Sequence, residues 1–142
     1  MIGLLIITHE TLGEAYTQLA KHFFDEVPTN VRILGVRGDD SPQTLVAGAE
    51  VLLAQLDCSD GTLMLTDIFG ATPCNTAQKL IHDHNTLMVA GLNAPMMVKA
   101  IQYAAKSNNV HELAEAVKQA AINGIMIIDY NDVSHCDAET RS

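Results

Sequence analysis

The chain has 142 residues, a length that suits one domain with a single hydrophobic core. Seventeen acidic residues stand against eight basic ones, which gives a formal net charge of -9 at pH 7. Because nucleic acids are bound mainly through Lys and Arg, this balance argues against a nucleic-acid partner. No apolar run approaches the length of a membrane span, so membrane insertion is not expected.

Cysteine usage favours a cytoplasmic location. The three cysteines, Cys58, Cys74 and Cys136, are odd in number, widely spaced and without a CxxC pattern. This arrangement favours reduced thiols over a disulfide framework. Met1 is followed at once by an apolar run without a basic leader, so we expect no secretory signal peptide.

Short apolar runs alternate with amphipathic segments in the first half of the chain. Residues 2–7 are apolar throughout, which is typical of a strand buried on both faces. Thr11 and Glu14 form a T-x-x-E pattern, which predicts a capping box at the start of a helix. A second strand is predicted at 31–36, and Ser41 before Pro42 predicts the start of the next helix. The apolar positions expected to be buried by these two helices are Leu12, Ala15, Tyr16, Leu19 and Phe23, and then Leu45, Ala49, Leu52 and Leu53.

The same alternation continues in the second half. A third strand is predicted at 62–66, and Thr72 before Pro73 predicts an N-cap and the first residue of a helix. A fourth strand at 86–90 is followed by helices at 94–105 and from Asn109 onward. The apolar run at 125–128 predicts a fifth strand, and the polar residues from 130 onward are expected to fray.

This alternation predicts an α/β fold of three layers, with helices on both faces of a doubly wound, mostly parallel sheet. Ligands of such sheets bind beyond the carboxyl ends of the strands. Three predicted strand ends carry chemically useful residues. They are Thr8-His9-Glu10, the run from Asp67 to Asn75, and Gly91-Leu92-Asn93-Ala94-Pro95-Met96.

His9 and Asp67 are the candidate catalytic residues. If the first and third strands are neighbours, the two side chains lie side by side. A neutral imidazole is a good nucleophile near pH 7, and a carboxylate on one ring nitrogen fixes the tautomer and leaves the other nitrogen free to attack. The candidate phosphate-binding residues follow Asp67, because the chain there runs into a helix N-terminus whose free N–H groups suit an anion. They are Phe69, Gly70, Ala71 and Thr72.

Other common sites find no support in the sequence. It contains no GxGxxG after the first strand, no GxxxxGK[ST] and no GxSxG. Lys99 is the single basic residue near these loops in sequence, which is too little to hold a polyphosphate. His82, His84 and His111, and His135-Cys136-Asp137 in the tail, lack a matched ligand set, so no metal site and no cofactor are predicted.

The three strand-end motifs together resemble the mannose-family EIIA domain of the bacterial phosphoenolpyruvate:sugar phosphotransferase system (PTS). The resemblance covers roughly the first 129 residues, and residues 130–142 remain as a polar C-terminal tail. It implies that His9 accepts a phosphoryl group from phospho-HPr and passes it to an EIIB component during sugar uptake. Asp67 would support the histidine, and Thr72 would lie near the phosphate. It also implies a homodimer in which an antiparallel strand, here 125–128, is exchanged between subunits.

Two departures from the family pattern leave alternatives open. Glu10 stands where many members have Gly, and we expect its carboxylate to point away from a phosphate. The sequence carries no EIIB domain, so a separate EIIB partner is expected. A stand-alone regulator, whose phosphorylation controls partner binding without sugar transport, is the main alternative. A hydrolase or binding module that uses His9 and Asp67 as general acid and base is another.

Overall fold

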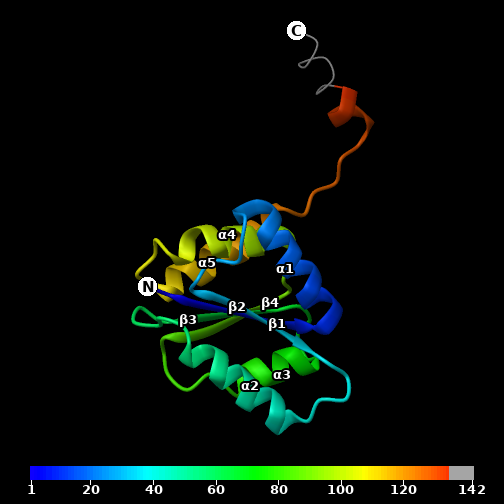
Figure 1. Ribbon diagram of the computed structural model, residues 1–142. Helices are drawn as coiled ribbons and strands as arrows, with labels where there is room; N and C mark the ends of the chain where they lie inside the picture. The colour runs from blue at the N-terminus through cyan, green and yellow to red at the C-terminus, as the bar shows by residue number, and fades with distance from the viewer. Residues whose placement is uncertain (135–142) are drawn as a thin grey trace.

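A computed structural model describes residues 1–134 of the chain, in three layers around one parallel sheet (Figure 1). The strands lie in the order β2-β1-β3-β4, and every neighbouring pair is parallel. Helices α1, α4 and α5 cover one face, and α2 and α3 cover the other (Figure 1). The elements are β1 (Gly3–His9), α1 (Glu10–Phe24), β2 (Val31–Val36), α2 (Pro42–Ala54), β3 (Thr62–Thr66), α3 (Thr72–Gln78), β4 (Thr86–Ala90), α4 (Ala94–Ala104) and α5 (Val110–Asn123). The predicted α/β class and its parallel sheet are therefore confirmed.

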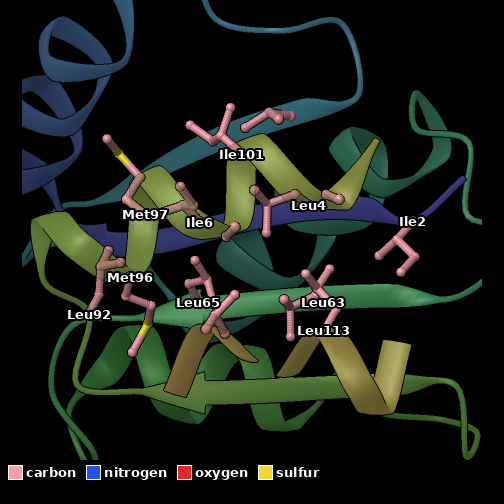
Figure 2. Packing of buried hydrophobic residues seen from close by; sticks show 14 of the residues in the cluster. Ile2, Leu4, Ile6, Leu63, Leu65, Leu92, Met96, Met97, Ile101 and Leu113 are labelled. Atoms are coloured by element: carbon pink, nitrogen blue, oxygen red, sulfur yellow. The ribbon is translucent and has the colours of Figure 1, made fainter. Parts of the chain in front are cut away.

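The two sheet faces bury separate apolar clusters. Alternate strand residues point to opposite faces, so Leu4, Ile6 and Leu63 pack under α4 and α5, as Figure 2 shows, whereas Leu5 and Met64 pack under α2 and α3. Residues 2–7 are all buried, as their continuous apolar run predicts. Aliphatic side chains, methionines and alanines fill both clusters.

Three helix starts are fixed by side-chain caps. Ser41 Oγ accepts the Thr44 N–H at 3.2 Å, and Asn109 Oδ1 accepts the N–H groups of His111 and Glu112. The predicted starts of α2 and α5 are therefore confirmed. Asn93 caps α4 in the same way, through the Met96 N–H at 3.0 Å.

The predicted capping box of Thr11 and Glu14 is wrong. β1 continues to His9, and α1 begins directly at Glu10 with no side-chain cap. Thr11 therefore lies inside the first turn. The buried face of α1 also differs from the prediction, because Leu12 and Phe23 are exposed while Gly13 and Ala20 are buried. The reason is a close contact: a Cβ on Gly13 would lie 3.2 Å from the Cα of Gly35 in β2.

The predicted N-cap of α3 needs correction, and the fifth strand, predicted to be exchanged between two subunits, stays a prediction. Ala71, rather than Thr72, occupies the N-cap position of α3, and no side chain caps this helix. Residues 125–128 form no strand with the described part of the chain. They leave the end of α5 as an extended, exposed segment (Figure 1). Residues 130–134 make a helical turn, in which the Val133 N–H donates to Asp129 O. Cys136 and its neighbours His135 and Asp137 lie outside the described residues.

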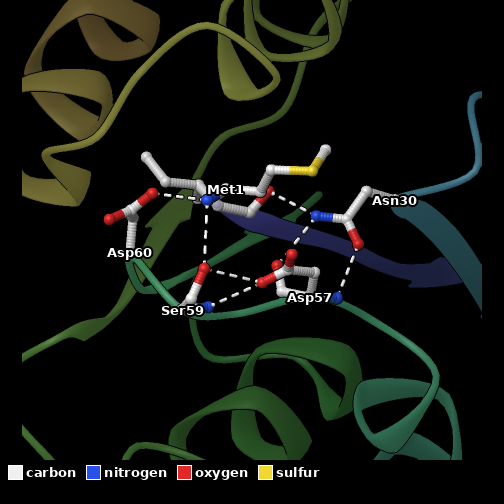
Figure 3. A network of polar contacts seen from close by, with 6 residues as sticks. Met1, Asn30, Asp57, Ser59 and Asp60 are labelled. Atoms are coloured by element: carbon white, nitrogen blue, oxygen red, sulfur yellow. Dashed lines mark hydrogen bonds and ion pairs between the residues drawn. The ribbon is translucent and has the colours of Figure 1, made fainter.

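A polar network ties together the amino-terminal ends of the strands (Figure 3). The Asn30 side chain donates to Ile2 O and Asp57 O, each at 2.9 Å, and accepts the Asp57 N–H at 2.7 Å. The Met1 ammonium group pairs with Asp60, and this hydrogen bond raises its pKa above the ordinary value. The network lies at the end of the strands opposite to His9. None of the helices in residues 1–134 is both long and apolar enough to cross a membrane.

Candidate functional site

His9 and Asp67 meet at the carboxyl edge of the sheet. β1 and β3 are adjacent and parallel, with Ile7 opposite Thr66, so the residues that follow them emerge side by side. His9 is the last residue of β1 and the N-cap of α1, and Asp67 comes directly after β3. The predicted juxtaposition of the two side chains is confirmed.

One carboxylate oxygen of Asp67 holds His9 at two points. Oδ2 lies 2.6 Å from His9 Nδ1 and accepts the His9 backbone N–H at 2.9 Å. The other oxygen, Oδ1, accepts the Ile68 N–H at 2.9 Å. The Asp67 side chain is 4% exposed, whereas the His9 side chain is 46% exposed. The ring is therefore held by Asp67 on its buried side, and its solvent-facing side is accessible to a partner protein.

The carboxyl group of Asp67 is ionised under ordinary conditions. Burial acts to raise its pKa, but the hydrogen bonds from the His9 backbone, the His9 ring and the Ile68 N–H outweigh burial and lower the pKa below its usual value. An ionised carboxylate can only accept hydrogen bonds, so Nδ1 of His9 carries the proton. The lone pair of the neutral ring is then on Nε2.

The loop from Ile68 to Ala71 offers unpaired backbone donors. Gly70 has a φ of 86°, a conformation that favours glycine. The N–H groups of Phe69, Gly70 and Thr72 have no hydrogen-bond acceptor within residues 1–134, whereas the Ala71 N–H donates to Ile68 O at 3.3 Å. Three of the four predicted phosphate-binding residues therefore keep a free N–H.

Thr72 and Phe69 both face solvent in this loop. Thr72 is the first residue of α3, and its hydroxyl has no hydrogen-bond partner in the described part of the chain. Phe69 is 72% exposed and Ile68 is 57% exposed. Exposed apolar side chains beside a reactive group are typical of protein-binding surfaces.

The third predicted strand end is structural. Gly91 has a φ of 90°, and the Leu92 N–H donates to Thr66 O. Asn93 caps α4 and also donates from Nδ2 to Ala121 O at 3.1 Å. This segment fixes α4 and α5 beside the site. Tyr16 lies on the same side, and its pKa is raised by burial and by the negative charge of Asp67.

The sequence reasoning missed one charged residue, Arg37. It follows β2 directly, and the register of the sheet places its neighbour Val36 opposite His9. Arg37 Nε donates to Glu10 Oε1 at 3.0 Å. Its position could have indicated it, because Arg37 follows the end of a strand, as Asp67 does. The pair also bears out the expectation that Glu10 turns aside, since its carboxylate is directed to β2.

His82, His84 and His111 take part in local contacts. His82 Nδ1 lies 2.9 Å from Leu80 O, and His111 Nε2 lies 2.8 Å from His84 O. Within residues 1–134, no group of three or more His, Cys, Asp or Glu side chains is arranged to hold a metal ion.

Comparison with known proteins identifies the family. The family model EIIA-man, described as "PTS system fructose IIA component", matches residues 3–118. The chain belongs to this family of PTS components. The resemblance that the three motifs indicated is thus confirmed.

Relatives and solved structures agree with this assignment. The chain is 26% identical over 125 residues to the mannose-specific EIIAB component of Escherichia coli K12, which aligns with 87% of this chain. The chain spans 38% of the length of that relative. A mannose/sorbose-specific IIA subunit from Enterococcus faecalis superposes with a TM-score of 0.74 at 26% identity, over 89% of this chain and 94% of the other. An EIIA component from Streptococcus agalactiae has the same fold, with a TM-score of 0.78 at 19% identity, over 92% and 98% of the two chains.

Proposed function

We propose that the protein is a phosphocarrier that accepts a phosphoryl group from phospho-HPr on His9 and passes it to an EIIB component in sugar uptake. The observation that carries this proposal is the half-exposed ring of His9 held by the buried, ionised carboxylate of Asp67. The similarity to the mannose-specific EIIAB component of Escherichia coli supports the same step. The proposed exchange takes place in the cytoplasm, in agreement with the cysteine usage of the chain.

The proposed reaction is an in-line phosphoryl transfer between two histidines. As the bond from phosphorus to the donor nitrogen breaks, a bond from phosphorus to His9 Nε2 forms. The proton on Nδ1 stays in place, so the phosphorylated ring carries a positive charge. The carboxylate of Asp67 stabilises that charge at 2.6 Å and keeps the ring oriented, which lowers the cost of reaching the transition state.

The loop after Asp67 is the proposed phosphate-binding segment. Its support is the set of unpaired N–H groups of Phe69, Gly70 and Thr72, together with the free hydroxyl of Thr72. A phosphoryl group offers acceptor oxygens that such donors can bind without a metal ion. Ala71 contributes the N-cap of α3 rather than a free donor.

A homodimer with exchanged 125–128 segments remains part of the proposal. Within the described residues, β4 pairs with β3 on one side only. A groove of about 510 Å³ lies beside it, lined by β4 and α5. The isoleucines of the segment are 64–94% exposed, which is unusual for so many apolar side chains in a row. A second copy of the segment would cover the unpaired edge and remove this exposure.

The test is phosphorylation by the PTS itself. The protein is incubated with phosphoenolpyruvate, enzyme I and HPr, and its mass is measured before and after brief acid treatment. Wild type gains one acid-labile phosphate, and His9→Ala does not. His84→Ala is the matched control, because His84 is exposed and precedes β4, at the amino-terminal ends of the strands and away from His9. A His9→Ala variant that still gains the phosphate would contradict the assignment.

A second measurement tests the onward step. Phosphorylated protein is mixed with an EIIB domain of the mannose type, and the loss of phosphate from one and its gain by the other are followed by mass. Transfer is expected on mixing. A stable phosphoprotein that no EIIB domain discharges would contradict the transport role while leaving His9 as the phosphorylated residue.

A further inference from the structure

The charge around His9 poses a problem for a phosphorylated state. A phosphoryl group adds about one and a half to two negative charges. Asp67 Oδ2 lies 2.6 Å from His9 Nδ1, and Glu10 directly follows His9 in the chain, so the nucleophile has one carboxylate in contact and a second on the adjacent residue. The positive charge that the ring gains on phosphorylation compensates the negative charge of Asp67. The negative charge of Glu10 is not compensated by the ring.

Arg37 supplies the missing positive charge. Its Nε donates to Glu10 Oε1 at 3.0 Å, and this ion pair joins the start of α1 to the end of β2. Lys99, the basic residue nearest in sequence to the other loops, lies instead over the ring of Tyr103, with Nζ 4.0 Å from the ring centre. Arg37 is therefore the cation that the described part of the chain directs to the residue beside His9.

The backbone positions the two partners independently of the ion pair. Gly35 allows α1 to approach β2, because a Cβ there would lie 3.0 Å from the Cα of Glu10. Asp40 fixes the backbone of Arg37: its carboxylate accepts the Arg37 N–H at 2.9 Å, and its own N–H donates to Arg37 O at 3.2 Å. The backbone of both residues is already fixed by these contacts, so less conformational entropy is lost when the two side chains pair.

We propose that Arg37 neutralises Glu10 and thereby allows His9 to carry a phosphoryl group next to a carboxylate. This inference rests on the proposed function of His9. Arg37 acts through Glu10 and does not itself touch the phosphoryl group. Because Arg37 and Glu10 form one ion pair, the effects of changing either residue have to be considered together.

The test is a double-mutant cycle on the phosphotransfer equilibrium with HPr. Arg37→Gln leaves the charge of Glu10 uncompensated and lowers the equilibrium constant for phosphoryl gain by about three- to fivefold. Glu10→Gln alone leaves it at the wild-type value or above. The double variant matches Glu10→Gln, because the loss of Arg37 no longer matters once the carboxylate is gone. Thermal unfolding of all four proteins verifies that they are folded.

Two controls separate this effect from others. Lys21→Gln removes one positive charge from the far end of α1, about 16 Å along the helix, and leaves the equilibrium unchanged. Raising the ionic strength from about 0.01 M to about 1 M removes most of the Arg37→Gln deficit, because the Glu10 carboxylate is exposed and its repulsion of the phosphoryl group becomes screened. A change that only altered the fold would not respond to salt in this way.

Each other outcome has a distinct meaning. If wild type gains no phosphate, the proposed function fails and the inference fails with it. If wild type is phosphorylated and Arg37→Gln equals it, the pair has no role and the inference alone is overturned. If the Arg37→Gln deficit is undiminished in the Glu10→Gln background, Arg37 contacts the phosphoryl group directly, which also overturns the inference.

Discussion

At the scale of single residues, Asp67 connects stability to chemistry. Its two oxygens accept three N–H groups, two from the backbone and one from the His9 ring. An amide in its place has one oxygen and an NH2 group, so at least one of those three donors would face another donor. The carboxylate is thus needed both to close the strand ends and to orient the ring.

Asp67→Asn is therefore expected to lower stability and phosphorylation together. The free energy of unfolding falls by about 1–3 kcal/mol, because a buried donor loses its acceptor. The rate of phosphoryl gain falls by roughly 10- to 100-fold, because the ring loses its orienting partner. Urea unfolding and the mass assay with HPr measure the two effects. Asp83→Asn is the control, since Asp83 also accepts two hydrogen bonds but lies at the opposite edge. Equal loss of phosphorylation in both variants would contradict the role of Asp67.

The lowered pKa of Asp67 also predicts an acid-sensitive contribution to stability. A group whose pKa is lower in the folded state stabilises the fold above its unfolded pKa, about 4 for Asp. That contribution disappears as the pH falls through the folded pKa. The stability difference between wild type and Asp67→Asn should therefore be present above about pH 5 and shrink below about pH 4. The lowered pKa values of Asp57 and Asp83 cancel, because both proteins contain these residues. A difference that grows in acid would contradict this account.

The predicted juxtaposition of His9 and Asp67 is confirmed, because each residue ends an apolar strand and the sheet brings those strand ends together. Arg37 ends β2 in the same way, but its importance depends on the contact with Glu10 across two elements, which no local pattern encodes. Thr72 was expected to cap α3, yet the loop reaches the helix one residue earlier, at Ala71.

At the scale of elements, two glycines decide how α1 lies on the sheet. A Cβ on Gly35 would meet the Cα of Glu10 at 3.0 Å, and a Cβ on Gly13 would meet the Cα of Gly35 at 3.2 Å. The helix backbone therefore lies almost directly against β2. The face of α1 nearest to β2 carries the smallest side chains, Gly13 and Ala20. Leu12 and Phe23 are therefore exposed, although their spacing is helical.

Gly35→Ala is expected to push the first turn of α1 away from β2. Overpacking against backbone costs about 1–3 kcal/mol of unfolding free energy, since neither backbone segment can move aside freely. Gly48→Ala is the matched control: Gly48 lies inside α2 with nothing near its Cβ position, so Ala there raises stability by up to about 1 kcal/mol. Urea unfolding of both variants measures the change in unfolding free energy, which is expected to be a loss for Gly35→Ala and a gain for Gly48→Ala. A neutral Gly35→Ala would show that the helix has room to shift.

The elements themselves were largely predictable. The strands at 31–36, 62–66 and 86–90 have the predicted bounds, because buried apolar runs flanked by polar or glycine-containing turns leave few alternatives. The starts of α2 and α5 follow from Ser41 and Asn109, whose side chains compete for the first N–H groups of a helix. α1 was misplaced at its start, because the strand passes into the helix at His9 without an intervening cap.

At the scale of the whole molecule, strand order lies beyond local sequence patterns. The alternation of strands and helices predicts a layered parallel sheet, but the order β2-β1-β3-β4 depends on long-range packing. The run at 125–128 has the composition of a strand and yet no partner within residues 1–134. A strand forms only where another strand accepts its hydrogen bonds, so composition alone could not determine its state.

Ile127→Asp is expected to weaken self-association. Ile127 is 94% exposed in the single chain and would be covered in the proposed exchanged dimer. A carboxylate buried there without a partner is unfavourable, so the dissociation constant rises at least about tenfold. Sedimentation equilibrium measures the change. Val51→Asp, at a 60% exposed position on α2, is the control and leaves association unchanged. A wild-type protein that sediments as one chain at all concentrations would contradict the dimer.

The exposed ring of Phe69 has a practical consequence. The chain contains no Trp, so Phe69→Trp would introduce its only indole fluorophore. The position is two residues from Asp67 and 72% exposed, and an indole there would start in water. Its emission would shift toward shorter wavelengths when a docking protein covers it. Complex formation and phosphoryl exchange could then be followed in real time, with an optical signal that comes from the reaction site alone.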